Sequence, residues 1–319
     1  MENKNIWLTY SAEEKEELHK ICELYKSWLD KGKTERECVE LAVELAEKAG
    51  YHNLEEYLSE ERQIQKGEKI YAVCMKKCIV LFRMGAEPIS AGMNILGAHI
   101  DSPRIDIKQN PLYEKDDFTY LDTHYYGGIK KYQWVTQPLA LHGVVVKKDG
   151  SCVNISIGER EDEPVFVITD LLVHLASKQL EKKAGEVIEG EKLDILVGNC
   201  PIERDENLKE ERETVKANVL KILEEAYGIS EEDFASAELE IVPSGKARDI
   251  GFDRSMILAY GQDDRICAFT SIMAMLSVED SSRTACCLLV DKEEIGSVGA
   301  TGMASNFFEN TIAEIMELA

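Results

Sequence analysis

Several features that would place a chain in a membrane, on nucleic acid or outside the cell are missing from this sequence. It has no run of about 18 apolar residues that could cross a bilayer, and the first twenty residues lack the apolar core of a signal peptide. Nine cysteines form no CxxC pair, and their number is odd, which favours free thiols in a reducing cytoplasm. Basic residues are scarce, 37 against 60 acidic ones, and the net charge of −23 argues against nucleic acid or an anionic membrane as a partner.

What is present fits a globular chain with a sizeable core. The 319 residues are 44% hydrophobic and 30% charged, which suits roughly two domains. Ser11 followed by Glu14 is a capping-box pattern at the start of a predicted helix that ends at Gly50. The next predicted elements are a hairpin at 69–83, a buried strand at 93–101 and a short helix in "DLLVHLASKQLEKK". In 203–228 the first half is a charge run that fits a solvated helix or a mobile loop, and the second half has the apolar stripe of a helix. A strand, turn and helix in "SMILAYGQDDRICAFTSIMAML", a strand in "TACCLLV" and a final helix in "ASNFFENTIAEIMELA" follow.

The order of these elements predicts an α/β domain interrupted by another. Residues 1–104 and 247–319 have the α/β pattern, whereas residues 105–246 are β-rich and carry turn signals such as Asp149-Gly150. Sites in parallel sheets lie at the carboxyl ends of the strands. The polar residues that follow the predicted strands of the discontinuous domain are therefore the candidates for a functional site.

Three short motifs stand at such strand ends: "GAHIDSPR", "GQDDRICAF" and "DKEEIGSVGATG". They supply six acidic or imidazole groups, namely His99, Asp101, Asp263, Asp264, Glu293 and Glu294. Each motif alone has an ordinary explanation, because Asp-Asp pairs often cap helices and Glu-Glu pairs often lie on surfaces. Together, carboxylates that converge without a partner would raise one another's pKa and destabilise the fold, and a bound dication removes that penalty.

The residue types indicate which ion and which chemistry. Imidazole and carboxylate ligands without thiolate fit zinc, cobalt or manganese at a hydrolytic site. Asp101, two residues after His99 in an extended segment, can orient the imidazole ring for metal binding. Of the adjacent Glu293 and Glu294, one can bind metal while the other moves a proton, which is the chemistry of peptide hydrolysis by a two-metal enzyme.

In this order and spacing, the three motifs resemble the aspartyl aminopeptidase / aminopeptidase I family of dinuclear zinc exopeptidases, and "YYGGIKKYQW" and "DLLVHLASKQL" resemble its inserted region. The resemblance covers nearly the whole chain. It implies an α/β/α catalytic domain with an inserted β-rich dimerisation domain, two Zn²⁺ per full-length subunit, short peptides with a free amino terminus as substrates, and self-association into dimers or tetrahedral dodecamers. The implied roles are His99, Asp263 (bridging) and Glu294 as metal ligands, Glu293 as general base, Asp101 as the orienting carboxylate and Asp264 as the neighbour that supports Asp263.

The sequence departs from that family in two respects. Family members are longer, and their remaining aspartate and histidine ligands would lie beyond residue 319, so we expect a C-terminally truncated chain. Where the aspartate-preferring members carry a histidine after the "GG" turn, this chain has Lys130, Lys131 and Tyr132, which leaves acidic and neutral amino-terminal residues equally open as substrates. Lys131 is a weaker candidate for contacting substrate.

Two alternatives remain beside a metal-dependent aminopeptidase. A related dinuclear-metal amidohydrolase would use the same ligand set, and a truncated, non-catalytic subunit of this fold would have the same motifs. His174, on a predicted apolar helix, is expected to be a core or interface histidine, with a metal role as the minor possibility.

Overall fold

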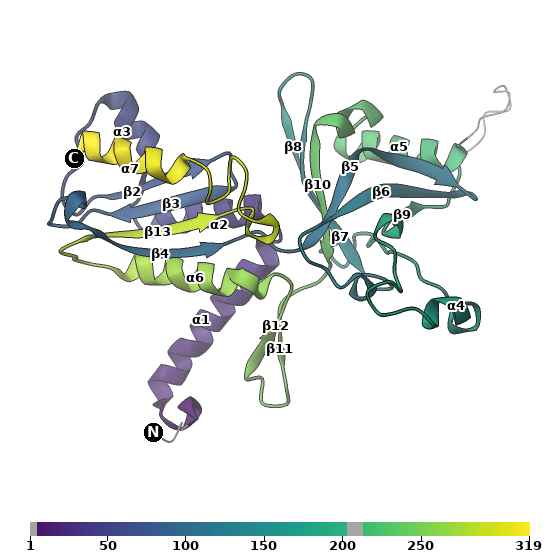
Figure 1. Cartoon of the computed structure of the whole chain (residues 1–319), viewed down its shortest axis with the longest axis horizontal. Coiled ribbons are helices and arrows are strands. Elements are labelled where there is room, and N and C mark those ends of the chain that lie inside the picture. Colours follow the sequence, from purple (N-terminus) through teal and green to yellow (C-terminus); the bar gives the residue numbers. More distant parts are fainter. Residues whose placement is uncertain (1–4, 203–212) are drawn as a thin grey trace. The chain divides into compact units, whose positions relative to one another are not determined.

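The computed structural model describes residues 5–202 and 213–319 of the chain. Its internal contacts divide the chain into two compact units, Met1–Asp101 with Lys246–Ala319, and Ser102–Gly245. The first unit is therefore discontinuous in sequence, and the second is inserted into it. Figure 1 labels the elements of both.

A five-stranded sheet forms the centre of the first unit, in the order β1-β2-β3-β13-β4. Its strands are β1 (His52–Asn53), β2 (Lys69–Cys74), β3 (Cys78–Arg83), β4 (Met93–His99) and β13 (Thr284–Val290). β13 runs parallel to β4 and antiparallel to β3, with Val290 opposite His99. β4 and β13 are thus neighbours in the sheet with their carboxyl ends side by side, although they lie far apart in the sequence.

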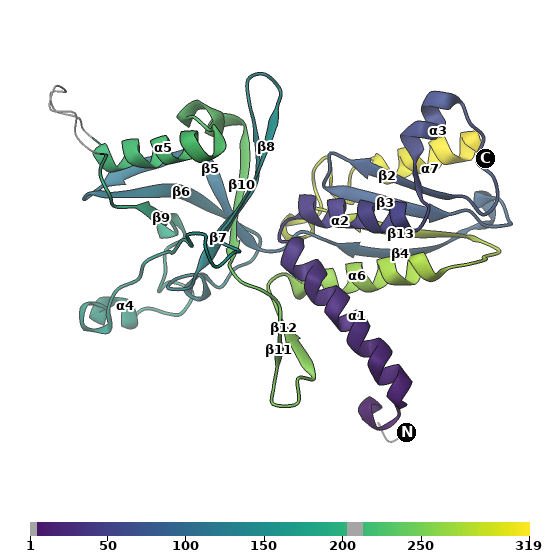
Figure 2. The same cartoon turned by 180° about the vertical axis from the view of Figure 1, so that it is seen from behind.

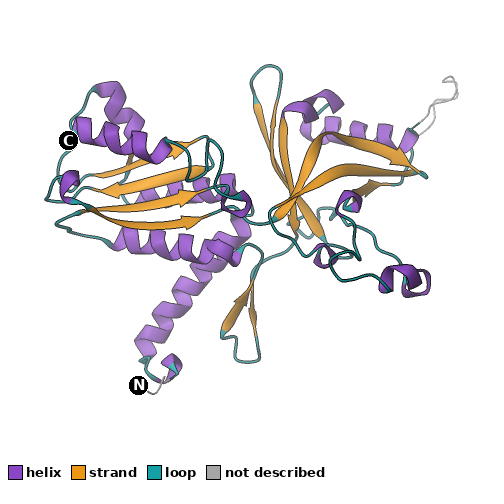
Figure 3. Ribbon diagram, in the orientation of Figure 1, coloured by secondary structure: helices purple, strands orange, loops and turns teal. Residues whose placement is uncertain are grey.

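Helices cover both faces of this sheet, as Figure 3 shows. On one face lie α1 (Ala12–Lys31), α2 (Glu35–Lys48) and α6 (Gln262–Ser277), and on the other lie α3 (Leu54–Glu60) and α7 (Phe307–Leu318). Because side chains alternate along a strand, Ile79 and Leu81 of β3 enter one core while Val80 and Phe82 enter the other. Burying each such side chain contributes about 1.5–3 kcal/mol, so a strand that is apolar at every position specifies a central place in three layers.

The predicted single helix from residue 11 to 50 is wrong, because it is two helices. Ser11 and Glu14 form the expected capping box at the start of α1. A second capping box follows, in which Glu37 N–H donates to Thr34 and the Glu37 carboxylate accepts from Thr34 N–H, so that α2 starts anew after α1 ends at Lys31. Gly50, with φ of +84°, ends α2 as predicted, since this left-handed conformation suits glycine.

The other predictions for this unit are largely confirmed, with one error of burial. The hairpin at 69–83 is β2 and β3, and the strand, turn and helix after residue 255 are β12 (Met256–Leu258) and α6. The segment 93–101 is a strand, but it is not buried: Ile95 is 51% and Leu96 41% exposed. β4 lies at the edge of the sheet in the part of the chain that the structure describes, so packing on its far side is incomplete.

The second unit is a six-stranded sheet in the order β8-β7-β10-β5-β6-β9, antiparallel throughout. Its strands are β5 (Arg104–Lys115), β6 (Phe118–Tyr126), β7 (Leu139–Val146), β8 (Cys152–Ile157), β9 (Ile195–Gly198) and β10 (Ala237–Pro243). Helix α5 (Thr214–Tyr227) begins where the Glu114 carboxylate accepts hydrogen bonds from the amides of Val215 and Lys216, both at 2.9 Å. A carboxylate at this end of a helix is favourable because the first-turn amides have no partner within the helix.

The predicted short helix in "DLLVHLASKQLEKK" is confirmed in part, as α4 (Ser177–Leu180) and a 3-10 turn at Val173–Leu175. The large apolar side chains of this segment face solvent rather than a core, so no packing stabilises a longer helix. The predicted helix in 203–228 is confirmed as α5, while the charge run at 203–212 lies outside the described residues.

A two-stranded hairpin, β11 (Arg248–Ile250) with β12, precedes α6, as seen in Figures 1 and 2. Among the residues that the structure describes, no helix combines the length and hydropathy needed to cross a membrane. All nine cysteines are free thiols.

Candidate active site

The candidate site lies where β4 and β13 end side by side. His99 is the last residue of β4, and the chain that follows β13 carries Glu293 and Glu294 in a single 3-10 turn. Ile100 N–H donates to the Val290 carbonyl at 2.9 Å, which extends the parallel pairing one step past His99. Residues almost two hundred positions apart are therefore held together by backbone pairing.

Asp101 links these two strand ends. Its carboxylate is completely buried and accepts hydrogen bonds from the amides of Glu293 (3.2 Å) and Glu294 (3.1 Å). The same carboxylate lies 3.4 Å from Nδ1 of His99, and the Asp101 backbone carbonyl lies 3.0 Å from that nitrogen. Asp101 therefore fixes the orientation of the imidazole ring and the position of the glutamate turn together.

The other ring nitrogen of His99 faces the acidic groups. Nε2 lies 3.4 Å from Oδ1 of Asp263 and 3.7 Å from Oε2 of Glu293. With Nδ1 directed at the oxygens of Asp101, the proton of a neutral ring belongs on Nδ1, which leaves the lone pair of Nε2 directed toward the carboxylates. His99, Glu293 and Glu294 offer ligand atoms that all lie within 4.8 Å of one another.

The electrostatics of this group favour a cation. Burial alone would lower the pKa of His99, but the hydrogen bonds and charge of Asp101, with Glu293 adding, raise it to about 9. Burial raises the pKa of Glu294 above its usual range; His99 opposes that rise, and the negative charges of Asp101, Asp263 and Glu293 add to it. The protonated form of His99 and the neutral form of the partly buried Glu294 are thus both favoured, as expected where several anionic groups converge.

Asp263 and Asp264 reach the site from a different kind of element than the sequence suggested. They stand at the start of α6, behind the hairpin β11–β12, and not at the end of a strand of the main sheet. The peptide between them is cis, and both have non-helical backbone angles. Asp263 points its largely exposed carboxylate at His99, whereas the nearby Asp264 carboxylate raises the pKa of the Cys267 thiol.

The donor set fits a zinc ion. One imidazole nitrogen with its second nitrogen held by an aspartate, together with carboxylates and no thiolate, is the arrangement of hydrolytic zinc sites. Nε2 of His99 faces oxygen acceptors on two sides, so it needs either a proton or a metal ion between them. His99, Glu293 and Glu294 bring their ligand atoms within 4.8 Å of one another, and Asp263 faces Nε2 of His99 at 3.4 Å, so these four residues could hold the ion.

Two weaker candidates from the sequence lie in the second unit. His174 is exposed, so the expectation of a core position is wrong while that of an interface position stays a prediction, and it does not belong to the described group around His99. Lys131 begins a 3-10 turn after the "GG" pair and is partly buried.

Two residues inside the quoted motifs were not assigned a role from the sequence. Asp291 is fully buried and accepts hydrogen bonds from Thr301 Oγ1 (2.6 Å) and from the amide of Lys292 (2.7 Å), so it holds the turn that carries the glutamates. Arg265 is also fully buried, two residues after Asp263. Their motif positions were the available signal, but burial depends on packing between distant segments.

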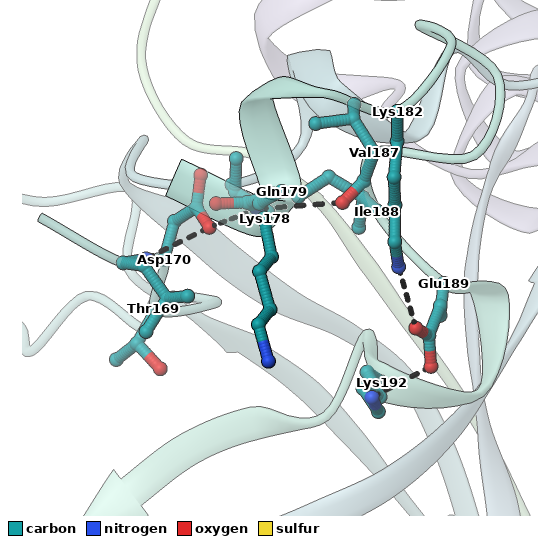
Figure 4. Close-up of a pocket in the computed structure, with 11 residues that line it drawn as sticks. Thr169, Asp170, Lys178, Gln179, Lys182, Val187, Ile188, Glu189 and Lys192 are labelled. Carbon is teal, nitrogen blue, oxygen red and sulfur yellow. Dashed lines mark hydrogen bonds and ion pairs between the residues drawn. The ribbon is translucent and has the colours of Figure 1, made fainter. Parts of the chain in front are cut away.

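A cavity of about 460 Å³ lies in the second unit, and Figure 4 shows its lining. Glu189 pairs with Lys182 at 3.1 Å and with Lys192 at 2.6 Å, and the Gln179 amide donates to Asp170 at 2.8 Å. Most of its charged groups are thus already paired within the cavity wall. It has no imidazole or thiol, so the group around His99 remains the chemically competent one.

A three-layer α/β/α unit with imidazole and carboxylate groups at the carboxyl ends of adjacent parallel strands is characteristic of metal-dependent hydrolases of the zinc-exopeptidase type. Comparison with known proteins identifies the family. The family model described as "Aminopeptidase I zinc metalloprotease (M18)" matches residues 28–319. A probable M18 family aminopeptidase 1 from Clostridium acetobutylicum is 57% identical over 99% of this chain and 67% of its own length. One from Thermotoga maritima is 42% identical over 100% and 67%.

Solved structures agree. The crystal structure of an M18 family aminopeptidase from Thermotoga maritima has a TM-score of 0.92 at 42% identity, covering 100% of this chain and 67% of that one. That of aminopeptidase I from Clostridium acetobutylicum has a TM-score of 0.89 at 54% identity, covering 99% and 68%. The chain belongs to the M18 family of zinc metallo-aminopeptidases, and the predicted fold class and enzyme class are confirmed. It spans about two thirds of the length of these relatives.

Proposed function

We propose that the enzyme releases the amino-terminal residue from short peptides, with His99, Asp263 and Glu294 as zinc ligands, Glu293 as general base and Asp101 as the residue that orients His99. The observation that carries this assignment is the convergence of His99, Glu293 and Glu294 within 4.8 Å, beside Asp263. Cobalt or manganese fits the same oxygen and nitrogen donors.

The two adjacent glutamates have different surroundings, which supports different roles. Glu294 is the less exposed, and its raised pKa reflects burial among acids, a burden that a bound cation relieves. The Glu293 side chain is 56% exposed and can therefore reach solvent and substrate. Zinc at this site supplies Lewis-acid activation of a water molecule and of the substrate carbonyl.

The protein residues then provide orientation and proton transfer. Asp101 keeps the Nδ1 proton of His99 in place, so that Nε2 stays directed at the ion. Glu293 accepts the proton of the attacking water and returns it to the departing amine, which is general base and then general acid catalysis by one carboxylate. Asp263 would be a ligand shared by the two ions that we propose per full-length subunit, and Asp264, next to it at the start of α6, would support it.

Substrate selection and assembly involve the second unit in this proposal. Lys131 can pair with an acidic side chain or a carboxylate of the peptide, and either an acidic or a neutral amino-terminal residue is compatible with it. We also propose that the second unit mediates self-association, because Leu172, Val173, Leu175 and Leu180 are between 65% and 72% exposed within one short segment.

The test of the assignment is Glu293→Gln. The substitution keeps shape but cannot accept a proton, so turnover of unblocked peptides should fall by about 10²–10⁴-fold while zinc content stays unchanged. Release of the amino-terminal residue and emission spectroscopy for zinc measure the two quantities, and His99→Ala serves as the contrast that should lose zinc.

Turnover retained in Glu293→Gln would disprove the role of Glu293. Hydrolysis of acylated amino acids in preference to free-amine peptides would instead identify a related amidohydrolase.

A further inference from the structure

Arg265 is buried in the first unit in a way that stability alone does not explain. It lies on α6, is 1% exposed, and donates from Nε to the Ile100 carbonyl at 3.2 Å and from Nη2 to the Lys33 carbonyl at 2.9 Å. Nη1 has no hydrogen-bond partner among the described residues. None of the ion pairs found in the described part of the chain joins Arg265 to a carboxylate.

Such a guanidinium carries a large desolvation penalty. Arginine stays charged in proteins, and two neutral carbonyls offset the loss of hydration only in part. An apolar side chain of similar size would fill the same space without leaving a donor unsatisfied. The arginine is therefore best explained by what its two carbonyl bonds hold in place.

The carbonyl that Arg265 binds belongs to the residue between His99 and Asp101. The amide of Ile100 donates to Val290 at 2.9 Å, so this one residue is held by β13 through its N–H and by α6 through its C=O. Asp263, two residues before Arg265, faces Nε2 of His99 at 3.4 Å. The hydrogen bond from Arg265 thus fixes the distance between the helix that carries Asp263 and the strand end that carries His99.

Gly261 leaves the space that this arrangement needs. A Cβ at position 261 would lie 2.2 Å from Nη1 of Arg265 and 2.9 Å from its Cζ. The φ of +76° at Gly261 also disfavours a side chain. The motif "GQDDR" therefore contains the glycine that leaves space for the guanidinium, the two aspartates, and Arg265 itself.

We propose that Arg265 is a positioning residue that holds the His99–Asp101 segment at the correct distance from Asp263, so that the zinc ligands from β4 and α6 are pre-arranged before the ion binds. This inference rests on the proposed zinc ligands. It assigns no direct contact with ion or substrate to Arg265, which acts through the backbone of Ile100.

The test is zinc affinity, measured on the full chain by competition with a chromophoric zinc chelator. Arg265→Gln removes the positive charge and the two separate donor nitrogens that reach the two carbonyls, and should weaken zinc binding by about 10–100-fold, the usual effect of removing a residue that orients a ligand. Arg265→Lys retains the charge and a single donor nitrogen and should recover part of that loss. Ile272→Ala, a fully buried residue of the same helix, is the control for general destabilisation and should leave the affinity within about twofold of wild type at an equal or larger drop in Tm.

Gly261→Ala tests the positioning role of Arg265 by placing a Cβ against its guanidinium. It should weaken zinc binding in the wild-type background and weaken it less in the Arg265→Gln background, because the collision with the guanidinium is then absent. If Arg265→Gln does not fold, Arg265→Lys and Gly261→Ala still decide the question.

Wild-type zinc affinity in the Arg265 variants, or a loss no larger than that of Ile272→Ala, would overturn the inference. His99→Ala separates this failure from a failure of the proposed function. If His99→Ala also binds zinc normally, the ligand assignment is wrong; if it loses zinc while Arg265→Gln does not, only the positioning role is wrong.

Discussion

The buried carboxylate of Asp101 makes contacts with both halves of the site. It accepts two amide hydrogen bonds from the turn at Glu293–Glu294 and faces His99. The "GAHIDSPR" motif itself gives no sign of the contact with the glutamate turn. Hydrogen bonds to charged acceptors contribute about 1.5–3 kcal/mol each, so this residue combines a structural and an electrostatic role.

Asp101→Asn should therefore have two measurable effects. An amide offers one acceptor oxygen in place of two and no charge, so we expect a loss of about 1–3 kcal/mol in the free energy of unfolding and a weakening of zinc binding by about 10-fold or more. Urea denaturation and calorimetric zinc titration measure these.

Asp249→Asn is a suitable control, since Asp249 pairs with Lys26 at 2.7 Å outside the group around His99. Zinc binding that is equally strong in Asp101→Asn and in the control would contradict the orienting role.

At the scale of elements, the exposed edge of β4 is the feature with the clearest consequence. β4 pairs with β13 on one side, and in the described residues no strand pairs with its other side. Ile95 and Leu96 are exposed along it. An apolar edge strand is a template for pairing with other chains.

Ile95→Lys should therefore reduce aggregation without unfolding the chain. A charge on an exposed edge blocks intermolecular pairing, and the loss of a half-exposed isoleucine should change stability by no more than about 1 kcal/mol. Light scattering during incubation, with circular dichroism as the check on folding, distinguishes the outcomes. Met75→Lys, at an exposed turn position, is the control that should leave aggregation unchanged.

At the scale of the whole molecule, the exposed apolar segment of the second unit gives the prediction for assembly. The double substitution Leu172→Ser and Leu175→Ser removes two side chains that are 72% and 70% exposed, so it should leave folding intact and shift the chain toward a smaller species in sedimentation velocity. Leu8→Ser, at an 83% exposed leucine of the first unit, is the matched change that should not shift it. Unchanged sedimentation in the double variant would mean that this segment does not mediate association.

How far the sequence predicts this molecule differs from segment to segment. β13 and α6 could be identified because their apolar residues follow the period of a buried strand or a helix, and the acidic motifs could be located because they follow directly. The exposure of "DLLVHLASKQLEKK" could not be predicted, because an apolar run has the same pattern whether it faces a core or solvent. The burial of Arg265 could not be predicted, because it depends on the Ile100 and Lys33 carbonyls, which lie 165 and 232 positions away.

The contact of Asp101 with the amides of Glu293 and Glu294 spans 192 and 193 positions of sequence. The ribosome synthesises His99 and Asp101 long before Glu293 and Glu294. During translation the nascent chain therefore contains the residues from β4 without the two glutamates. With the proposed ligands, zinc binding by His99, Asp263 and Glu294 is therefore a late event in synthesis, and a polypeptide released before residue 293 contains His99 without Glu293.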